Sequence, residues 1–206
     1  MVDLRRLMIV LTLVTAVAGV ALALVEAVTR EPIAAQRRLE MMRALMAVLP
    51  PVDNAPDQDA VRLVTGRNTK GQELVRTFYR GRQGNELRGI AFAVTAPDGY
   101  SGTIEIMVGV DPQGTVTGVA ILKHAETPGL GDKIARPEFT GRFLGKALET
   151  ADWRVKKDGG DFDQLTGATI SPRAVVGAIR GGLEFFRDHR DAIVAGAKEG
   201  HDDAAR

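Results

Sequence analysis

A long uncharged apolar run near the N-terminus constrains the fold of this chain more than any other feature of the sequence. Residues 7–25 read LMIVLTLVTAVAGVALALV, in which two threonines are the polar interruptions. A helix over this run is about 28 Å long at 1.5 Å per residue, close to the hydrocarbon thickness of a bilayer. The chain is therefore predicted to have one transmembrane helix ahead of its folded part.

The residues alone leave the fate and the orientation of this helix open. Arg5 and Arg6 precede the run, and Ala21-Leu22-Ala23 resembles a cleavage site, so a removed signal peptide is the alternative to an anchor. The run is longer than a usual signal core, which favours an uncleaved anchor. Basic residues flank the run on both sides, so charge counting gives no clear orientation. Those on the far side are Arg30, Arg37 and Arg38.

The composition excludes several functions. Lys and Arg total 27 against 26 Asp and Glu, so this 206-residue chain has no basic field that indicates nucleic-acid binding. Cysteine is absent, which excludes disulfides, thiolate metal sites, iron–sulfur ligation and cysteine nucleophiles. The three histidines are scattered and indicate no metal cluster. Redox chemistry in this chain therefore requires an organic cofactor.

Beyond the apolar run, the pattern predicts a juxtamembrane helix and then a linker. A helix is predicted over residues 30–49, with Pro32 near its start. Its apolar face is formed by Leu39, Met42, Leu45, Met46 and Leu49. Residues 50–59 read PPVDNAPDQD, which breaks any helix and predicts a linker or a surface loop.

Five short runs rich in β-branched and apolar residues then predict strands. They are VRLVTG (61–66), LVRTFYR (74–80), GIAFAVTA (89–96), TIEIMVGVD (103–111) and VTGVAILKH (116–124). Residues 111–114 are predicted to form a hairpin turn, and helices are predicted around 137–148 and from Ser171 onward. Strands followed by helices, without a βαβ alternation, predict an α+β fold with an antiparallel sheet and packed helices.

Residues 163–173, DQLTGATISPR, set small residues and hydroxyls directly before a predicted helix. Ser171 is predicted as its N-cap and Pro172 as its first residue. The apolar positions that follow are Val175, Val176, Ile179, Leu183 and Phe186. Because a helix N-terminus presents unpaired N–H groups, the small residues leave room for an anion such as phosphate beside Thr169. The structural alternative is a plain turn, in which Gly167 supplies an unusual φ and Thr169 a local cap.

Residues 124–134, HAETPGLGDKI, predict a rigid turn with an exposed apolar tip. Pro128 fixes one backbone angle, while Gly129 and Gly131 allow unusual values at two others. Leu130 between them is predicted to point outward, an arrangement that suits contact with a flat aromatic ring. A purely structural loop is the alternative.

Together these segments resemble the covalently flavinylated FMN-binding domain. The resemblance covers about the last half of the chain and is carried by DQLTGAT (163–169), HAETPGLGD (124–132) and GYSGTIEIMVGVD (99–111). This domain occurs in the G subunit of the Rnf electron-transport complex and in the C subunit of the sodium-pumping NADH:quinone oxidoreductase. Its flavin transferase recognises Asp, two variable residues, Ser or Thr, Gly, Ala and Thr. The matching positions are Asp163, Thr166, Gly167, Ala168 and Thr169.

The resemblance implies FMN as a covalent cofactor, held as a phosphothreonine ester on Thr169 Oγ and attached by a separate flavin transferase that uses FAD and magnesium. It also implies a loop against the flavin, with Thr127 and Leu130 as its foremost contacts. The implied loop residues are Glu126, Thr127, Gly129, Leu130 and Gly131. Lys133, Trp153 and Lys157 are looser candidates, with an exposed charge or a core aromatic as the structural alternative. No catalytic or metal-binding residue is expected, and His124 is not expected to be a ligand.

The implied function is that of an electron-carrier subunit, rather than a stand-alone enzyme, in a membrane complex that couples ferredoxin oxidation, NAD reduction and ion movement. The implied partners are integral-membrane and iron–sulfur subunits of an Rnf-type complex, the flavin transferase and the lipid bilayer. The compact length favours the Rnf subunit over an NqrC-like subunit. A stand-alone membrane-anchored flavoprotein and a module without flavin are the two competing hypotheses.

The resemblance also implies a topology. It places the chain in the bacterial cytoplasmic membrane as a single-pass protein, with the flavin domain on the periplasmic side. The expected parts are a cytoplasmic N-terminus and anchor (1–28), a juxtamembrane helix and linker (29–60), an extracytoplasmic FMN-binding domain (61–190) and a polar tail (191–206).

Overall fold

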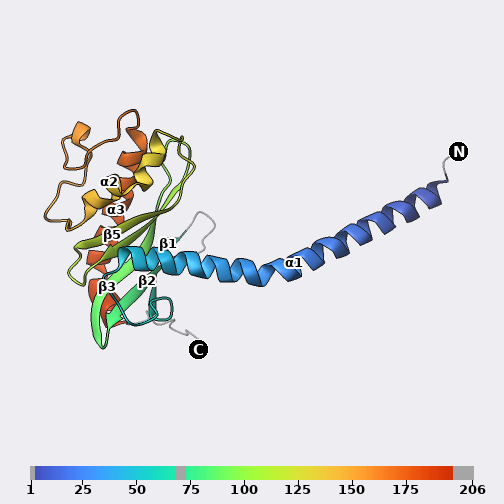
Figure 1. Ribbon diagram of the computed structural model, residues 1–206, viewed down its shortest axis with the longest axis horizontal. Coiled ribbons are helices and arrows are strands. Elements are labelled where there is room, and N and C mark those ends of the chain that lie inside the picture. Colours follow the sequence, from blue (N-terminus) through green and yellow to red (C-terminus); the bar gives the residue numbers. More distant parts are fainter. Residues whose placement is uncertain (1–2, 68–72, 197–206) are drawn as a thin grey trace. The chain divides into compact units, whose positions relative to one another are not determined.

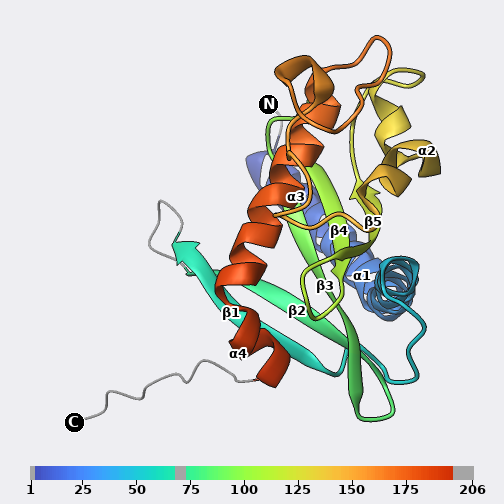
Figure 2. The same cartoon turned by 90° about the vertical axis from the view of Figure 1, so that its left-hand side faces the viewer.

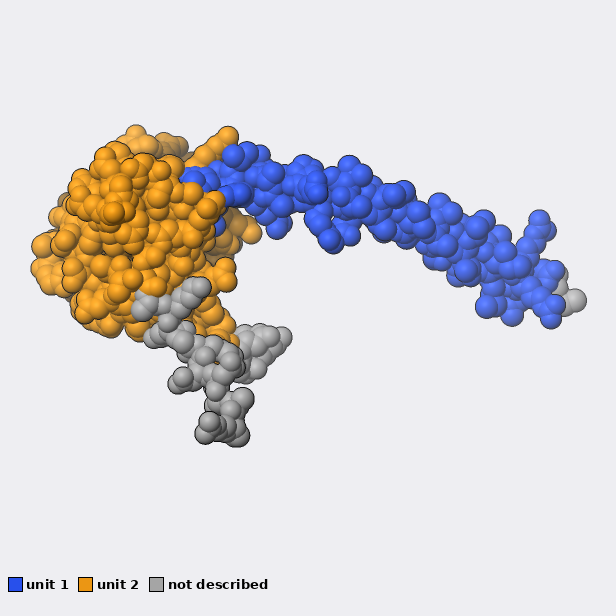
Figure 3. Space-filling model, turned by 90° about the horizontal axis from the view of Figure 1, so that it is seen from below, with its two compact units in different colours: residues 1–42 blue, residues 43–206 orange. Residues whose placement is uncertain are grey.

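The computed structural model of the chain describes residues 3–67 and 73–196. The chain divides into two compact units, residues Met1–Met42 and residues Arg43–Arg206, which are coloured separately in Figure 3. Nearly all of the first unit belongs to one helix, α1 (Leu4–Val48), whose last turns belong to the second unit. The second unit contains a sheet, its covering helices and the loops between them.

Helix α1 is long and apolar enough to cross a membrane. Its most apolar stretch buries none of its surface within the protein, and the hydroxyls of Thr15 and Thr29 donate to carbonyls one turn back, which satisfies them inside the helix. The sequence predicted a new helix beginning near Pro32. Instead α1 continues through Pro32 without ending, so the apolar run and the juxtamembrane stretch form one helix.

A five-stranded antiparallel sheet forms the centre of the second unit, with its strands in sequential order (Figure 1). The strands are β1 (Ala60–Arg67), β2 (Glu73–Gln83), β3 (Glu86–Ala96), β4 (Ile104–Val110) and β5 (Val116–Lys123). All five predicted strands are confirmed, and so is the turn between the last two, where the Gly114 amide donates to the Asp111 carbonyl at 3.0 Å. The predicted α+β class is therefore confirmed, since helices follow this meander.

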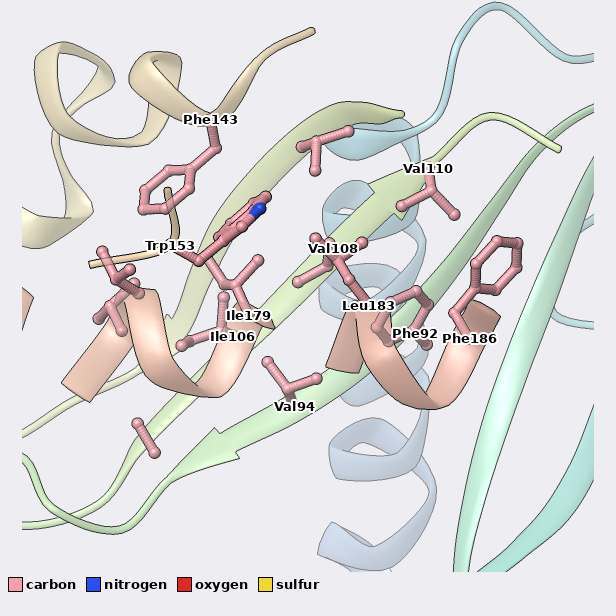
Figure 4. Packing of buried hydrophobic residues seen from close by; sticks show 14 of the residues in the cluster. Phe92, Val94, Ile106, Val108, Val110, Phe143, Trp153, Ile179, Leu183 and Phe186 are labelled. Carbon is pink, nitrogen blue, oxygen red and sulfur yellow. The ribbon is translucent and has the colours of Figure 1, made fainter. Parts of the chain in front are cut away.

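Helix α3 (Ile170–Asp188) crosses one face of the sheet, as Figure 2 shows. Its predicted apolar positions are buried, and Figure 4 shows Ile179, Leu183 and Phe186 pointing toward the strands. Gly182 brings α3 close to β3, because an added Cβ would lie 2.5 Å from Val94. The short helix α4 (Arg190–Ala195) follows α3 and buries Ile193. One continuous apolar core thus holds α3 against the sheet and fixes where its N-terminus lies.

The other face of the sheet receives the end of α1. Two glycine pairs lie across neighbouring strands there, Gly81 with Gly89 and Gly109 with Gly118. A Cβ on Gly118 would lie 2.5 Å from the Val48 Cα, and one on Gly89 would lie 2.7 Å from Pro50. The missing side chains therefore make room for the residues that end α1. Thr117 Oγ1 donates to the Val48 carbonyl at 2.7 Å and closes this contact.

Residues 50–59 form bends and a turn without helix or strand, which confirms the predicted loop. Hydrogen bonds and ion pairs join this loop to β2. The Asn54 side chain donates to the Arg80 carbonyl and accepts from the Arg82 amide. Asp59 forms ion pairs with the guanidinium groups of Arg80 and Arg82. The segment is therefore fastened along its length to the sheet.

The chain between β5 and α3 is mostly irregular. The helix predicted over residues 137–148 is much shorter, since only α2 (Pro137–Thr140) and a 3-10 turn η2 (Gly141–Phe143) form. Beyond them Gly145 has φ 72°, and its amide donates to the Val116 carbonyl, so the chain pairs with the start of β5 and leaves the helix. Two further 3-10 turns are η1 (Gly131–Ala135) and η3 (Lys156–Asp158). Four buried aromatic rings of this segment contact one another: Phe139, Phe143, Trp153 and Phe162.

Candidate functional site

Three loops converge at the N-terminal end of α3 and enclose a cavity of about 410 Å³. One loop joins β3 to β4, the second follows β5, and the third precedes α3. The lining residues are Tyr100 from the first loop, Glu126, Thr127, Leu130 and Gly131 from the second, and Gly167, Ala168, Thr169, Ile170 and Ser171 from the third. The two motifs that the sequence singled out, which are more than thirty residues apart, therefore share one cavity.

Thr169 occupies the N-cap position of α3 without capping the helix. Its φ and ψ are −102° and −34°, a helical conformation, and its hydroxyl makes no cap hydrogen bond. Within the described residues the amides of Ile170 and Ser171 donate no hydrogen bond, as is typical of the first turn of a helix. The cavity therefore meets a free hydroxyl together with the positive end of a 19-residue helix.

The predicted N-cap was wrong. Ser171 lies inside the first turn of α3 and is buried, and its hydroxyl donates to Glu126 Oε2 at 2.5 Å. A serine before Pro172 fits the rule for a cap equally well, but the competing acceptor comes from a loop that is distant in the sequence. The helix begins at Ile170, so Thr169 is the residue directly before its N-terminus.

Glu126 joins the three loops. The residue is only 4% exposed, and its carboxylate accepts from the Ser171 hydroxyl and from the Ser101 amide, the latter at 3.1 Å. Gly131 also packs against this pair, because an added Cβ would lie 2.7 Å from Glu126 Oε2. A buried carboxylate is costly unless it is hydrogen-bonded, so these two donors hold the loops in one arrangement.

Gly167 has a specific steric role in the motif. Its φ is 81°, in the left-handed region that side chains disfavour, and an added Cβ would lie 3.0 Å from Leu130 Cδ2. The leucine of one motif therefore packs over the glycine of the other. Leu130 still exposes 43% of its surface, as the sequence predicted for the tip of this loop.

Three of the predicted site residues do not line the cavity: Asp163, Thr166 and Gly129. Thr166 and Gly129 are exposed. The Asp163 carboxylate lies 2.6 Å from Lys156 Nζ and 3.3 Å from the Arg142 guanidinium. The hydrogen bond from Lys156, with the charges of both cations, holds the pKa of Asp163 below its ordinary value, against a smaller opposing effect of desolvation. These ion pairs fasten the start of the motif to the segments before it.

The looser candidates lie outside the cavity lining. Trp153 is buried among the core aromatics and its indole N–H donates to the Ala147 carbonyl at 3.1 Å, so the core alternative is the correct one. Lys157 is exposed on η3, and Lys133 lies in η1. His124 Nδ1 accepts from the Glu126 amide at 3.2 Å, which is a local contact of the loop.

Tyr100, Ile170 and Ser171 line the cavity but were not among the predicted site residues. Ser171 had been assigned to the cap of α3. Tyr100 stands between Gly99 and Ser101, and an aromatic residue within such a polar turn is the one signal in the sequence that points to it. Tyr100 and Ile170 are 67% and 45% exposed, so the cavity has an uncovered apolar rim.

Comparison with known proteins identifies the class of this domain. A family profile described as "FMN-binding domain" matches residues 99–184, a segment that contains every residue lining the cavity. The fold is shared with the crystal structure of Shewanella oneidensis NqrC, with a TM-score of 0.57 and 20% identity over 78% of this chain and 99% of that chain. The C subunit of a Na(+)-translocating NADH-quinone reductase from Parabacteroides distasonis is also similar, with a TM-score of 0.52 and 16% identity over 80% of this chain and 94% of that one.

Curated relatives then define the family. The G subunit of the ion-translocating oxidoreductase complex of Aliivibrio fischeri is 38% identical over 195 residues, which cover 92% of this chain and 93% of the relative. The G subunit of the Pseudomonas aeruginosa complex is 42% identical over 188 residues and covers 87% of each chain. The chain belongs to the family of ion-translocating oxidoreductase complex G subunits.

The residues at the cavity fit an FMN cofactor. The volume of about 410 Å³ lies within the usual range of small-molecule sites, about 300–1,000 Å³. A hydroxyl and two free amides at the start of α3 suit a phosphate group. The exposed side chains of Tyr100, Leu130 and Ile170 offer apolar surface to a flat ring, and Gly167 and Ala168 leave the approach to Thr169 open.

Proposed function

We propose that this chain is the flavin-carrying electron-transfer subunit of an Rnf-type ion-translocating complex, with FMN esterified to Thr169. The observation that carries the proposal is the free Thr169 hydroxyl, which faces a cavity of suitable size within a complete flavin-transferase motif. Membership of the G-subunit family supports the assignment to such a complex. The relay of electrons between the ferredoxin side and the NAD side is part of this proposal.

The proposed attachment is a group transfer from FAD by a flavin transferase. A bond forms between Thr169 Oγ and the FMN phosphorus, the phosphoanhydride bond of FAD breaks, AMP leaves, and the hydroxyl proton is released. Because Thr169 makes no cap hydrogen bond, its oxygen is available for this bond. The amides of Ile170 and Ser171 stabilise the remaining negative charge of the phosphodiester.

The other residues position and shield the group. The bound isoalloxazine accepts and donates electrons, and no side chain of the chain is required to react. Leu130 and Thr127 line the cavity, where Leu130 would present an apolar surface to the ring and Thr127 would offer a hydroxyl to a ring heteroatom. Glu126 holds their loop against the first turn of α3 through the hydroxyl of Ser171, next to the attachment point.

The exchange of Thr169 for valine tests the attachment, because valine keeps the shape of the side chain and removes the ester oxygen. The variant and the parent are coexpressed with a flavin transferase and examined by in-gel flavin fluorescence after denaturation. Thr169→Val is expected to abolish the fluorescent band at unchanged protein level. Thr166→Ser is the matched control, since the motif accepts serine or threonine at this position and Thr166 lies outside the cavity lining, and it should keep the band. A band that persists in Thr169→Val would place the attachment elsewhere.

We further propose that the flavin domain lies on the periplasmic side and that α1 contacts other integral subunits of the complex. The apolar surface of α1, unburied in this chain, supports a lipid or protein environment. A reporter that is active only in the periplasm should be active when fused after Arg206. Copurification from native membranes should recover integral and iron–sulfur subunits, and recovery of the chain alone would favour a stand-alone flavoprotein.

A further inference from the structure

We propose that Tyr100 is a flavin-contact residue whose phenol ring lies against the isoalloxazine and covers it. This inference rests on the proposed function, because it assumes a flavin in the cavity. It goes beyond the motifs of the sequence, since Tyr100 comes from the loop between β3 and β4, outside the attachment motif and the loop after β5.

The position of Tyr100 is unusual for an aromatic side chain. It is 67% exposed, while the phenylalanines and the tryptophan that form the ring stacks of the core are buried. Among the described residues that line the cavity, it is the one aromatic side chain. An aromatic ring left uncovered at the mouth of a cavity gains the most from a flat ligand, because stacking removes one face of each ring from water and adds the attraction between the two rings.

The backbone holds Tyr100 in place although its side chain is exposed. On one side, Gly99 sits so tightly that an added Cβ would lie 2.2 Å from the Gly102 carbonyl oxygen. On the other side, the Ser101 amide donates to Glu126. Because Glu126 also accepts from Ser171 in the first turn of α3, the backbone around Tyr100 is tied to the helix that starts at the attachment point. Such a residue is preorganised for a ligand anchored at Thr169.

Two other exposed apolar side chains share the rim with Tyr100. Leu130 comes from the loop after β5 and Ile170 begins α3, and both line the same cavity. The three side chains thus come from two loops and from the first residue of α3, and they line one opening. Apolar surface concentrated at a cavity mouth is typical of a ligand site, and a ring covered by these side chains would be shielded from water.

The proposed contact has an optical consequence. A phenol next to an excited isoalloxazine passes one electron to it and takes the electron back, so neither group is changed but the emission is quenched. Phenylalanine is too poor a donor for this transfer yet fills the same space. The other electron-rich rings are Trp153, which is buried in the core, and Tyr79 on β2, and neither lines the cavity.

The test uses the full chain, coexpressed with a flavin transferase and purified in detergent. Tyr100→Phe and Tyr100→Ala are compared with the parent and with Tyr79→Phe, a control at the other tyrosine of the chain, which lies on β2 outside the cavity lining. The measured quantities are the covalent flavin content of the denatured protein and the fluorescence lifetime of the native protein.

The expected result is a several-fold longer native lifetime in both Tyr100 variants, at a flavin content equal to that of the parent in Tyr100→Phe. The lifetime of Tyr79→Phe should equal that of the parent. Equal lifetimes in the parent and in Tyr100→Phe, at full flavin content, would overturn the contact while leaving the proposed function intact. A parent without covalent flavin would overturn the proposed function, and the inference with it.

Discussion

Close approach through glycine occurs in two regions of this protein, with opposite outcomes. At the end of α1, the pairs Gly81–Gly89 and Gly109–Gly118 admit Val48, Leu49 and Pro50, and the space is filled. At the start of α3, Gly131 and Gly167 admit Glu126 and Leu130, yet a cavity of about 410 Å³ remains beside them. The first region is closed by the chain's own residues, and Val48 and Leu49 are buried there. The second keeps an apolar rim exposed.

The difference teaches how to separate packing from binding in a glycine-rich protein. The glycines near the end of α1 are explained completely by close contact with the residues that end the helix, such as the backbone of Val48 against Gly109 and Gly118. At the cavity, close packing explains Gly131 and Gly167 but leaves unexplained the uncapped Thr169 and the exposed Tyr100. Features that packing does not explain are the ones that indicate a ligand. The predictions below test each side of this comparison, from the largest expected effect to the smallest.

Gly118→Val is expected to have the largest effect, because its side chain would collide with the Val48 backbone. A rigid neighbour cannot move aside as a side chain can, so the free energy of unfolding should fall by about 2–5 kcal/mol. Thermal unfolding followed by the fluorescence of Trp153, which is buried in the folded unit, measures the change. Gly181→Ala is the control, since its Cβ meets nothing within 4 Å, and it should leave stability equal or raise it by up to about 1 kcal/mol. Similar losses in both variants would contradict the role of the glycine pairs.

Ser171→Ala should cost about 1–3 kcal/mol of unfolding free energy, because the buried Glu126 carboxylate loses one of its two donors. The matched control is Ser101→Ala. Ser101 donates to the same carboxylate through its backbone amide, which alanine retains, so the loss there should stay below about 0.5 kcal/mol. Chemical denaturation of both variants gives the comparison. An equal loss in the two variants would show that the carboxylate does not depend on the Ser171 hydroxyl.

Gly167→Ala is expected to cost about 1–2 kcal/mol, because alanine is strained at a φ of 81°. Its Cβ would also lie 3.0 Å from Leu130, so flavin attachment should fall as well. Gly129→Ala separates these causes, since Gly129 has a similar φ of 77° but no neighbour within 4 Å. Covalent flavin content should fall in Gly167→Ala and persist in Gly129→Ala. Adding Leu130→Ala to Gly167→Ala should restore part of the lost flavin. Equal flavin content in all of these variants would remove the steric role of the motif glycine.

Lowering the pH should destabilise the protein slightly more through the ion pairs of Asp59 than through those of Asp163. Burial raises the pKa of Asp59, but hydrogen bonds and charges from Arg82 and Arg80 outweigh it, so the pKa lies below its ordinary value of about 3.9. The pKa of Asp163 is also lowered, chiefly by the Lys156 hydrogen bond. A lowered pKa means that each contribution to stability is present above the ordinary value and is lost as pH falls through the folded-state value.

The Asp59 side chain is 24% exposed and that of Asp163 is 47% exposed, so solvent screens the second more strongly. Asp59→Asn should therefore lower the melting temperature at neutral pH and reduce its acid dependence more than Asp163→Asn does. Melting curves from neutral pH down to about pH 3 check this order. A steeper change in Asp163→Asn would reverse it.

The sequence predicted the strands and α3 correctly because their apolar patterns match their burial. It was wrong where a distant partner decided the local structure. Ser171 looks like a cap by position, but Glu126 accepts its hydroxyl, and the chain after Gly141 leaves its helix to pair with β5. Pro32 was placed near a helix start, yet α1 continues through it. Rules that use neighbouring residues alone predict none of these three features.

The cavity itself was predictable only in part. The two motifs predicted Thr169 and Leu130 as site residues, and both line the cavity. Tyr100 stayed unassigned because its role depends on three loops meeting, which no local pattern encodes. Trp153 was an open candidate because a tryptophan suits either a core or a flavin, and its burial against the rings of Phe143 and Phe162 assigns it to the core.

The central claim is that the hydroxyl of Thr169 holds FMN as a phosphoester, and intact mass spectrometry of the full chain tests it most directly. The chain is coexpressed with a flavin transferase and analysed after denaturation, beside Thr169→Val. The parent is expected to exceed the mass of the apoprotein by one FMN less one water, and fragmentation should place the addition on Thr169. The Thr169→Val protein should have the mass of its apoprotein. An unmodified parent, or an equal addition in the variant, would contradict the claim.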